Sequence, residues 1–399
     1  MPRFKTGRPA CLSLLALVLA GCSARVIPPT AVLPVGAPDI AATVFLIGDA
    51  GAPRPSGEPV LEALERALQG HPDTTLILFL GDNAYPLGLP DSADRTFPEI
   101  ARRLKAQLDF ARLVPVVFVP GNHDWHRSGP EGLARIRRQG RFIARESAGR
   151  ARLLPTDGCP GPEVADVGAG LRLILLDTEW WLFPHEKPGE GSGCATGTQA
   201  EVIAHLGQLL REAGGRQVIV AAHHPLLTGG PHGGYFSLSD HLFPLRNLHP
   251  ALFVPLPIIG SAYPVARSLG ITAEDLASGP YKRLRAGLDS AFACAPPAIY
   301  AAGHDHGLQL LDRGRPPLLA VSGAGIYDHE SFLQRLPETR FVLSKGGFMR
   351  VDLLRDGRLR LGVIEATRAG EPRELYAELL PAARVEGRCG LASASGDKR

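Results

Sequence analysis

The first half of the chain alternates short apolar runs with longer amphipathic segments. The apolar runs are short enough for buried strands, and the longer segments carry apolar residues at helical spacing. We expect strands over 43–47, 75–80 and 115–119, and helices over 59–69, 97–110 and 132–146. This alternation predicts βαβ units, in which polar residues that follow the strands meet at the carboxyl edge of a parallel sheet.

The second half is less regular but contains elements of the same kind. Thr198 and Glu201 form a capping box, which predicts a helix from there through residue 212. Further elements are expected as strands over 217–221 and 298–302 and as a helix near 281–292. Near the end, apolar runs at 348–354 and 358–364 flank an Asp-Gly pair, which is typical of a β-hairpin.

Short polar blocks follow the apolar runs at five places. A Gly-Asp pair after a strand is often only a turn, and a buried histidine pair is often only packed, so one block carries little information. Five in series are strong evidence for a binuclear hydrolase. The blocks are Gly48-Asp49-Ala50-Gly51, Gly81-Asp82-Asn83-Ala84-Tyr85, Gly121-Asn122-His123-Asp124, Ala222-His223-His224-Pro225 and Gly303-His304-Asp305-His306.

These blocks contain the ligands that a two-metal phosphoesterase needs. Two cations about 3.5–4 Å apart hold a phosphoryl group and generate hydroxide from bound water, and one carboxylate must bridge them. Asp82 is the candidate bridge. Residues two apart in an extended segment face the same side, so His304 and His306 can both face the metals. The expected ligands are Asp49, Tyr85 and His306 for one metal, and Asn122, His223 and His304 for the other.

Tyr85 bears on the identity of the metals. A phenolate is a hard anionic donor that suits Fe(III) far better than Zn(II) or Mg(II). Two aspartates and one phenolate supply three negative charges against a trivalent and a divalent cation. The site then keeps a net positive charge that attracts a phosphate dianion and acidifies bridging water.

With these residues the chain resembles the purple acid phosphatases of the calcineurin-like metallophosphoesterase superfamily, most closely the small, tartrate-resistant type. The resemblance extends from about residue 44 to residue 322. Gly51 and Tyr85 stand where most calcineurin-like enzymes have a histidine and an aspartate, as in the purple phosphatases. The motifs that carry the resemblance are those at 81–85, 121–124, 303–306 with Leu308-Gln309, and Ser322-Gly323-Ala324-Gly325.

The resemblance implies an α/β (α+β sandwich) metallophosphoesterase fold, with two packed mixed β-sheets flanked by helices. It also implies a centre of Fe(III) plus a divalent ion (Fe, Zn or Mn), and acid-favoured hydrolysis of phosphate monoesters by metal-bound hydroxide. His123 is expected to stabilise the transition state and assist the leaving oxygen, with Asp124 orienting it. His232, nine residues after His223, matches a substrate-side histidine of that family.

Two other functions are also consistent with these residues. A phosphodiesterase or nucleotide pyrophosphatase could use the same metal pair. A non-catalytic surface lipoprotein could retain the fold, although every expected ligand is present. The chain also departs from the small purple phosphatases, because the segment between His232 and Gly303 is much longer. This segment shapes substrate access or adds packing at the domain edge.

The first residues predict export. Arg3, Lys5 and Arg8 precede an apolar run that is too short to span a bilayer as a mature helix. The following Leu19-Ala20-Gly21-Cys22 resembles a bacterial lipoprotein signal, which predicts that Cys22 is acylated and that the lipid anchors the protein to a membrane. The expected location is the outer membrane and periplasm or the cell surface. The alternative is an ordinary secretory signal. The expected regions are a signal peptide at 1–21, a proline-rich tether at 22–40, a phosphoesterase domain at 41–367 with an insertion at about 233–295, and a C-terminal extension at 368–399.

Composition and cysteine usage agree with an exported enzyme. The 399 residues include 45% hydrophobic and 21% charged residues, as in ordinary globular proteins. Without the signal's three cations, 40 basic residues remain against 40 acidic ones, so no nucleic acid is expected as a partner. Four cysteines outside the signal permit three pairings. We favour the pair Cys159–Cys194, because these two cysteines flank the strand expected at 171–176. The pair Cys294–Cys389 then follows by elimination. The alternative is that the four cysteines are buried free thiols.

Overall fold

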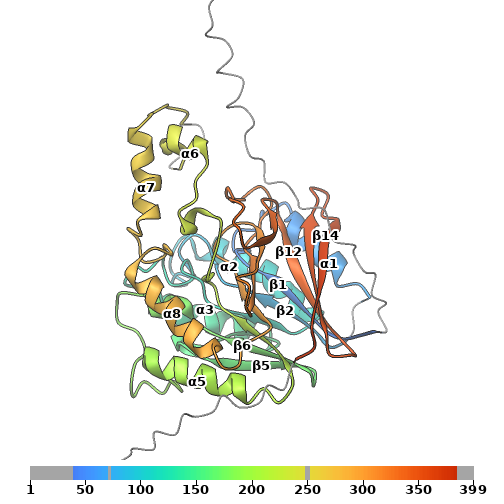
Figure 1. Ribbon diagram of the computed structural model, residues 1–399. Helices are drawn as coiled ribbons and strands as arrows, with labels where there is room; N and C mark the ends of the chain where they lie inside the picture. The colour runs from blue at the N-terminus through green and yellow to red at the C-terminus, as the bar shows by residue number, and fades with distance from the viewer. Residues whose placement is uncertain (1–38, 71–72, 248–251, 384–399) are drawn as a thin grey trace, which may run out of the picture.

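Two seven-stranded β-sheets form the centre of the computed structural model, which describes residues 39–70, 73–247 and 252–383 (Figure 1). The first sheet has the order β14-β13-β12-β1-β2-β3-β4 and the second the order β11-β9-β10-β8-β7-β6-β5. The first comprises β1 (Ile40–Ile47), β2 (Thr75–Phe79), β3 (Val116–Phe118), β4 (Ala151–Leu153), β12 (Gly347–Leu354), β13 (Leu359–Ala366) and β14 (Pro372–Leu380). The second comprises β5 (Glu163–Val167), β6 (Leu171–Leu175), β7 (Gln217–Ala221), β8 (Ile299–Ala302), β9 (Leu308–Leu311), β10 (Leu318–Ser322) and β11 (Thr339–Leu343).

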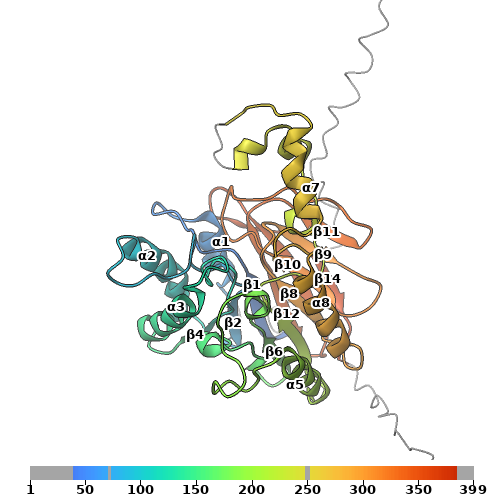
Figure 2. The ribbon, with the colours of Figure 1, turned by 90° about the vertical axis from the view of Figure 1, so that its left-hand side faces the viewer.

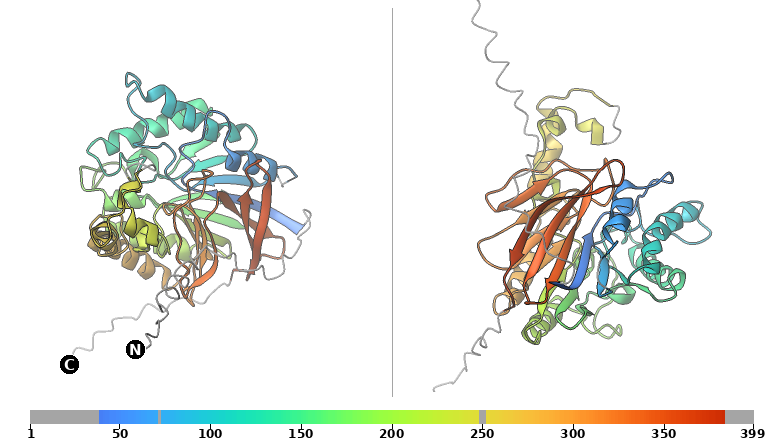
Figure 3. Two further views of the ribbon diagram at one scale, coloured as in Figure 1. Left: turned by 90° about the horizontal axis from the view of Figure 1, so that it is seen from above. Right: turned by 90° about the vertical axis from the view of Figure 1, so that its right-hand side faces the viewer.

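Helices cover the outer faces of the two sheets. Figure 2 shows α1, α2 and α3 on one side of the strands and α5 and α8 on the other. Seen from above in Figure 3, the strands again lie between these helical layers. The helices are α1 (Pro59–Ala67), α2 (Phe97–Leu108), α3 (Gly132–Glu146), α4 (Thr178–Leu182), α5 (Gln199–Arg211), α6 (Leu238–Leu242), α7 (Ala262–Ser268) and α8 (Gly279–Phe292).

Alternation along the central strands divides their side chains between two cores. In β1, Val44 and Leu46 pack with residues of the second sheet such as Ile219, forming the core between the sheets. Phe45 and Ile47 point the other way and belong to the core beneath the helices. All four side chains are fully buried. Strands buried on both faces read as continuous apolar runs, which is why the sequence predicts them well.

Most predicted elements are confirmed, including the fold of two mixed sheets flanked by helices. The helix over 132–146 and the strand over 217–221 have the predicted bounds, and Thr198 and Glu201 form the capping box that begins α5. The helix predicted over 97–110 ends at Leu108, because the chain tightens into a 3₁₀ turn from Asp109. The sheet continues past residue 367, where we expected the domain to end, because β14 pairs antiparallel with β13.

The segment expected as an insertion, residues 233–295, contains a projecting part and a part that packs on the body of the molecule. Helices α6 and α7 project from the body of the molecule in Figure 1, whereas α8 packs against α5 and α4. Of the helices described, not one is long and apolar enough to cross a membrane. The predicted signal peptide and the acylation site Cys22 lie outside the described residues, as do most of the tether and Cys389, the predicted partner of Cys294.

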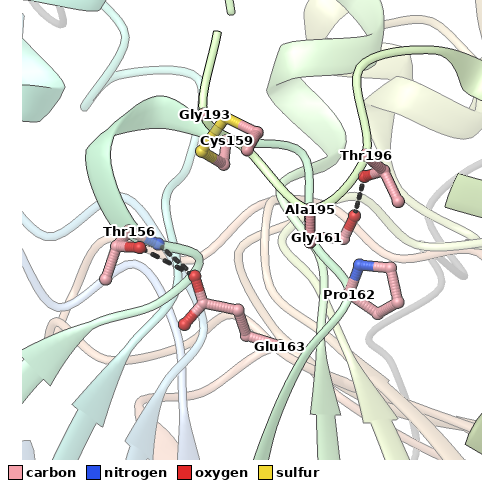
Figure 4. Close-up of a pocket in the computed structure, with 9 residues that line it drawn as sticks. Thr156, Cys159, Gly161, Pro162, Glu163, Gly193, Ala195 and Thr196 are labelled. Carbon is pink, nitrogen blue, oxygen red and sulfur yellow. Dashed lines mark hydrogen bonds between the residues drawn. A yellow bond between two sulfur atoms is a disulfide. The ribbon is translucent and has the colours of Figure 1, made fainter. Parts of the chain in front are cut away.

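The predicted disulfide between Cys159 and Cys194 is confirmed, with the two Cα atoms 5.7 Å apart. Figure 4 shows the bond beside a small cavity that Thr156, Glu163 and Thr196 help to line. Oγ1 and the backbone N–H of Thr156 both donate to Glu163 Oε1 at 2.8 Å. The lining of this cavity includes no residue of the five polar blocks, so the cavity belongs to the cross-linked loops.

Candidate metal centre

The five polar blocks meet where the carboxyl ends of both sheets come together. Asp49, Asp82 and Asn122 follow the parallel strands β1, β2 and β3 of the first sheet. His223 and His304 follow the parallel strands β7 and β8 of the second. Backbone hydrogen bonds connect the loops, from Gly48 N to Ser322 O at 2.7 Å and from Gly303 N to His223 O at 3.0 Å.

Glycine is required where these loops touch. A Cβ atom at Gly81, which has φ +93°, would lie 2.4 Å from His223 Nδ1, and one at Gly303 would lie 2.6 Å from Asp49 Oδ2. Any side chain there would therefore displace a candidate ligand. Three candidate ligands also adopt the left-handed backbone conformation, at a cost of roughly 1–3 kcal/mol each. These are Asp49 (φ 59°), Asp82 (φ 54°) and His304 (φ 72°).

Four donor atoms converge at the first predicted metal position. Tyr85 OH lies 3.0 Å from Asp49 Oδ1, 3.0 Å from Asp82 Oδ2 and 3.2 Å from His306 Nε2. His306 Nε2 and Asp49 Oδ1 are 3.5 Å apart. One phenol proton cannot satisfy all of these contacts. Atoms that bind one ion at about 2.1 Å and at right angles are about 3 Å apart, so this set fits a metal.

A second group of donors surrounds the other oxygen of the same aspartate. His223 Nε2 lies 3.0 Å from Asn122 Oδ1, 3.1 Å from His304 Nδ1 and 3.5 Å from Asp82 Oδ1. His223 Nδ1 lies 2.8 Å from the carbonyl of Leu80 and donates its proton there. Burial opposes protonation of His223, but the charges of Asp82 and Asp49 outweigh it and the pKa of His223 is raised. When Nε2 loses its proton, its lone pair points at the Asn122 oxygen. Lone pairs facing each other fit a cation between them. Asp82 thus has one carboxylate oxygen in each donor group.

Burial dominates the electrostatics of this centre. It raises the pKa of Asp49 well above its ordinary value. Burial, followed by the charges of Asp49 and Asp82, raises the pKa of Tyr85 well above its ordinary value. Burial also opposes ionisation of Asp82, but neighbouring His223 and His123 outweigh it and the pKa of this carboxyl is lowered. A phenolate at Tyr85 therefore needs a cation beside it.

His123 lies at the edge of the centre rather than within either donor group. Its Nδ1 lies 2.6 Å from the carbonyl of Pro86, its Nε2 lies 3.9 Å from Asp82 Oδ2, and its ring packs 4.4 Å from that of Tyr85. The Pro86 carbonyl fixes the ring, so the predicted role of Asp124 in orienting His123 needs correction.

Asp124 instead holds the backbone of the neighbouring blocks. Its carboxylate accepts hydrogen bonds from the backbone N–H groups of Asn83, Ala84 and Gly121 at 2.9–3.2 Å and from Gln139 Nε2 at 3.0 Å. Burial, with the charge of Asp82 adding to it, raises the pKa of Asp124 to about 6. Asp124 therefore joins the second and third blocks to each other.

The structure also brings the predicted substrate-side histidine to the centre. The ring of His232 packs 3.7 Å from that of His304, and His232 Nδ1 lies 3.1 Å from Arg267 Nη2 and 3.3 Å from the backbone carbonyl of Glu274. Two further residues lie here that the sequence did not indicate. His329 packs 4.6 Å from the ring of His306, and Glu274 accepts a hydrogen bond from Asn122. Both come from loops without a recognisable motif.

The second histidine of the fourth block points away from the donor groups. His224 is fully buried, and its Nδ1 lies 2.8 Å from Thr178 Oγ1. Its Nε2 is 3.7 Å from Glu179 Oε2, which is also buried. Burial lowers the pKa of His224 well below its ordinary value. His224 thus packs behind the centre as a neutral side chain.

The sequence model of the calcineurin-like phosphoesterase family matches residues 42–252, more than half of the chain. The chain therefore belongs to this family, whose fold and metal-binding loops agree with the geometry above. A two-metal phosphoesterase is the class of protein that the fold and the donor groups define together. No curated protein matches the chain.

Several solved structures are similar to this chain. One is GAP50, the anchor in the inner membrane complex of Plasmodium, with 14% identity and a TM-score of 0.49 over 86% of this chain and 89% of that one. Another is purple acid phosphatase PPD1 from yellow lupin (Lupinus luteus) seeds, with 13% identity and a TM-score of 0.48 over 84% of this chain and 53% of that one. PhoD has 12% identity and a TM-score of 0.48 over 85% and 68%.

Proposed function

We propose that this protein is a binuclear-metal phosphatase that hydrolyses phosphate monoesters. The observation that carries the proposal is the position of Asp82, whose two oxygens face two separate donor groups. Asp49, Tyr85 and His306 would hold one ion, and Asn122, His223 and His304 the other. Bound there, the two ions would supply charge for the phosphoryl oxygens and activation of water.

The surrounding residues have roles that the metals do not fill. His123 Nδ1 donates to the carbonyl of Pro86, which directs Nε2 toward the centre. When acid pH protonates the ring, Nε2 would carry a proton that it could transfer to the leaving oxygen. His232 Nδ1 lies between Arg267 Nη2 and the backbone carbonyl of Glu274, which would leave Nε2 to contact a phosphoryl oxygen. Two histidines, each held through its Nδ1, therefore flank the ligands of the metal pair.

Iron is the proposed occupant of the first donor group. Tyr85 OH lies 3.0 Å from two carboxylate oxygens, so ionising this phenol places three anions around one ion. A trivalent cation compensates that charge better than a divalent one, and phenolate is a ligand that Fe(III) favours. The second group, with one amide oxygen and two imidazoles beside Asp82, suits a divalent ion such as Fe, Zn or Mn.

Hydrolysis of two aryl phosphates tests the reaction class. The metal-loaded protein is expected to hydrolyse p-nitrophenyl phosphate with a kcat/KM at least tenfold above that for bis(p-nitrophenyl) phosphate. A dianionic monoester presents more charge to a net positive site than a monoanionic diester does. Asp82→Asn is the control for contaminating phosphatases, because it removes the bridging charge, and it should hydrolyse neither ester.

A preference for the diester would contradict the proposal and identify the protein as a phosphodiesterase or pyrophosphatase. Absence of hydrolysis of both esters by protein that carries two metal ions would also contradict it, in favour of a non-catalytic member of the family.

A further inference from the structure

Part of the segment 233–295 reaches the metal centre. The turn between α7 and α8 carries Glu274, whose Oε1 lies 3.0 Å from Asn122 Nδ2. One ligand atom each of Glu274, His232 and His304 also lie within 4.8 Å of one another. The segment in which this chain departs from the small purple phosphatases therefore adds a carboxylate beside the second donor group.

The contact with Asn122 determines which end of its amide faces the metal. Asn122 Nδ2 donates to Glu274, which leaves Oδ1 directed at His223 Nε2, 3.0 Å away. An amide oxygen binds a cation, whereas the NH₂ group cannot. Without an acceptor for Nδ2, the amide loses the partner that keeps its oxygen toward the ion.

His304 supplies the second, independent observation. Its side chain is 4% exposed, and Nδ1 points to the second donor group, 3.1 Å from His223 Nε2. Its other nitrogen, Nε2, is buried and has no hydrogen-bond partner among the described residues. A histidine that binds a metal usually donates its other ring N–H to a carboxylate or carbonyl. An oxygen of Glu274 lies within 4.8 Å of a ring nitrogen of His304, without a hydrogen bond to Nε2.

The turn that carries Glu274 is held in place by its own contacts. Leu276 N donates to His232 O at 3.0 Å, and Ser278 Oγ donates to Ala273 O at 2.9 Å. Asp275, which is fully buried, accepts a hydrogen bond from Arg267 Nε at 2.6 Å. These bonds fix the backbone on both sides of Glu274, so the fold itself directs this carboxylate at the centre.

We propose that Glu274 is a positioning residue of the second metal site, which holds the amide of Asn122 with its oxygen toward the ion. The segment 233–295 then contributes to how tightly the second ion binds. This inference rests on the proposed function, because it presumes that a metal occupies the second donor group.

The test is the affinity of the second site for Zn²⁺, measured by competition with a chelator on the full-length protein. Glu274→Ala is expected to weaken the second ion by about 10–100-fold and to leave the first in place. Glu274→Gln should retain most of the affinity, because its amide oxygen accepts the same hydrogen bond from Asn122. Glu65→Ala, which removes an exposed glutamate of α1, should bind both ions like the wild type.

Glu274→Asp provides a variant that keeps the charge and withdraws the carboxylate by one methylene group. It should also weaken the second ion, while the melting temperature of the metal-free protein stays unchanged. Wild-type affinity in both Glu274→Ala and Glu274→Asp would overturn the inference, as would equal weakening of both ions. A wild-type protein that binds no second ion would contradict the proposed function itself.

Discussion

His123 and His223 approach the same carboxylate from different directions, so replacing them should have different effects. His223 Nε2 faces Asn122 Oδ1 and His304 Nδ1, whereas His123 Nε2 lies 3.9 Å from Asp82 without joining a donor group. His223→Ala should therefore lose the second metal ion. His123→Ala should keep both ions and lower kcat on an aryl phosphate by about 10²–10⁴-fold.

Metal content and steady-state kinetics of the two variants, measured side by side, check this assignment. His205→Ala, on helix α5, is the control and should match the wild type in both. Loss of a metal ion from His123→Ala would make His123 a ligand, and full kcat in that variant would remove it from catalysis.

Residue type and spacing predict the seven candidate ligands, because each follows an apolar strand within a few residues or lies two or three positions from another ligand. The sequence does not predict the contact of Glu274 with Asn122, because the two residues are 152 positions apart and meet only when the turn before α8 packs against the centre. Adjacency in the sequence suggests His123 as the partner of Asp124, whereas its carboxylate accepts hydrogen bonds from the backbone N–H groups of Asn83 and Ala84. Such contacts depend on how separate loops pack.

At the scale of elements, the cross-link between Cys159 and Cys194 ties the loop before β5 to the loop before α5. Closing a loop of this length, with a sequence separation of 35, restricts the unfolded chain. The chain-entropy relation gives about 4 kcal/mol of stabilisation. Cys159→Ser/Cys194→Ser should therefore melt about 5 °C lower than the wild type in thermal denaturation.

Binding of both metal ions should persist in this double variant, since no residue of the five blocks lines the cavity beside the disulfide. An unchanged melting temperature would show that the bond adds no stability.

The strands that the sequence predicted best are buried on both faces and read as apolar runs. Short or edge strands such as β4 and β14 were not predicted, because their patterns are brief or mixed. The antiparallel pairing of β1 with β12 joins segments about 300 residues apart, and local patterns carry no information on such pairing. The order of strands within each sheet therefore came from the structure.

At the scale of the whole molecule, two parallel sheet regions place their carboxyl ends against each other. The first sheet contributes Asp49, Asp82 and Asn122, and the second contributes His223 and His304. Neither sheet alone holds a complete donor group. The centre therefore exists only in the packed molecule, and metal binding is expected to stabilise the contact between the sheets.

The central claim is that one folded chain binds two metal ions, and the metal content of the purified protein tests it most directly. We expect two ions per chain, one of them iron, with a visible absorption band that Tyr85→Phe abolishes. Two ions without iron would contradict the metal identity alone. A folded wild-type chain that binds one ion or none, even after incubation with iron and zinc, would contradict the binuclear centre.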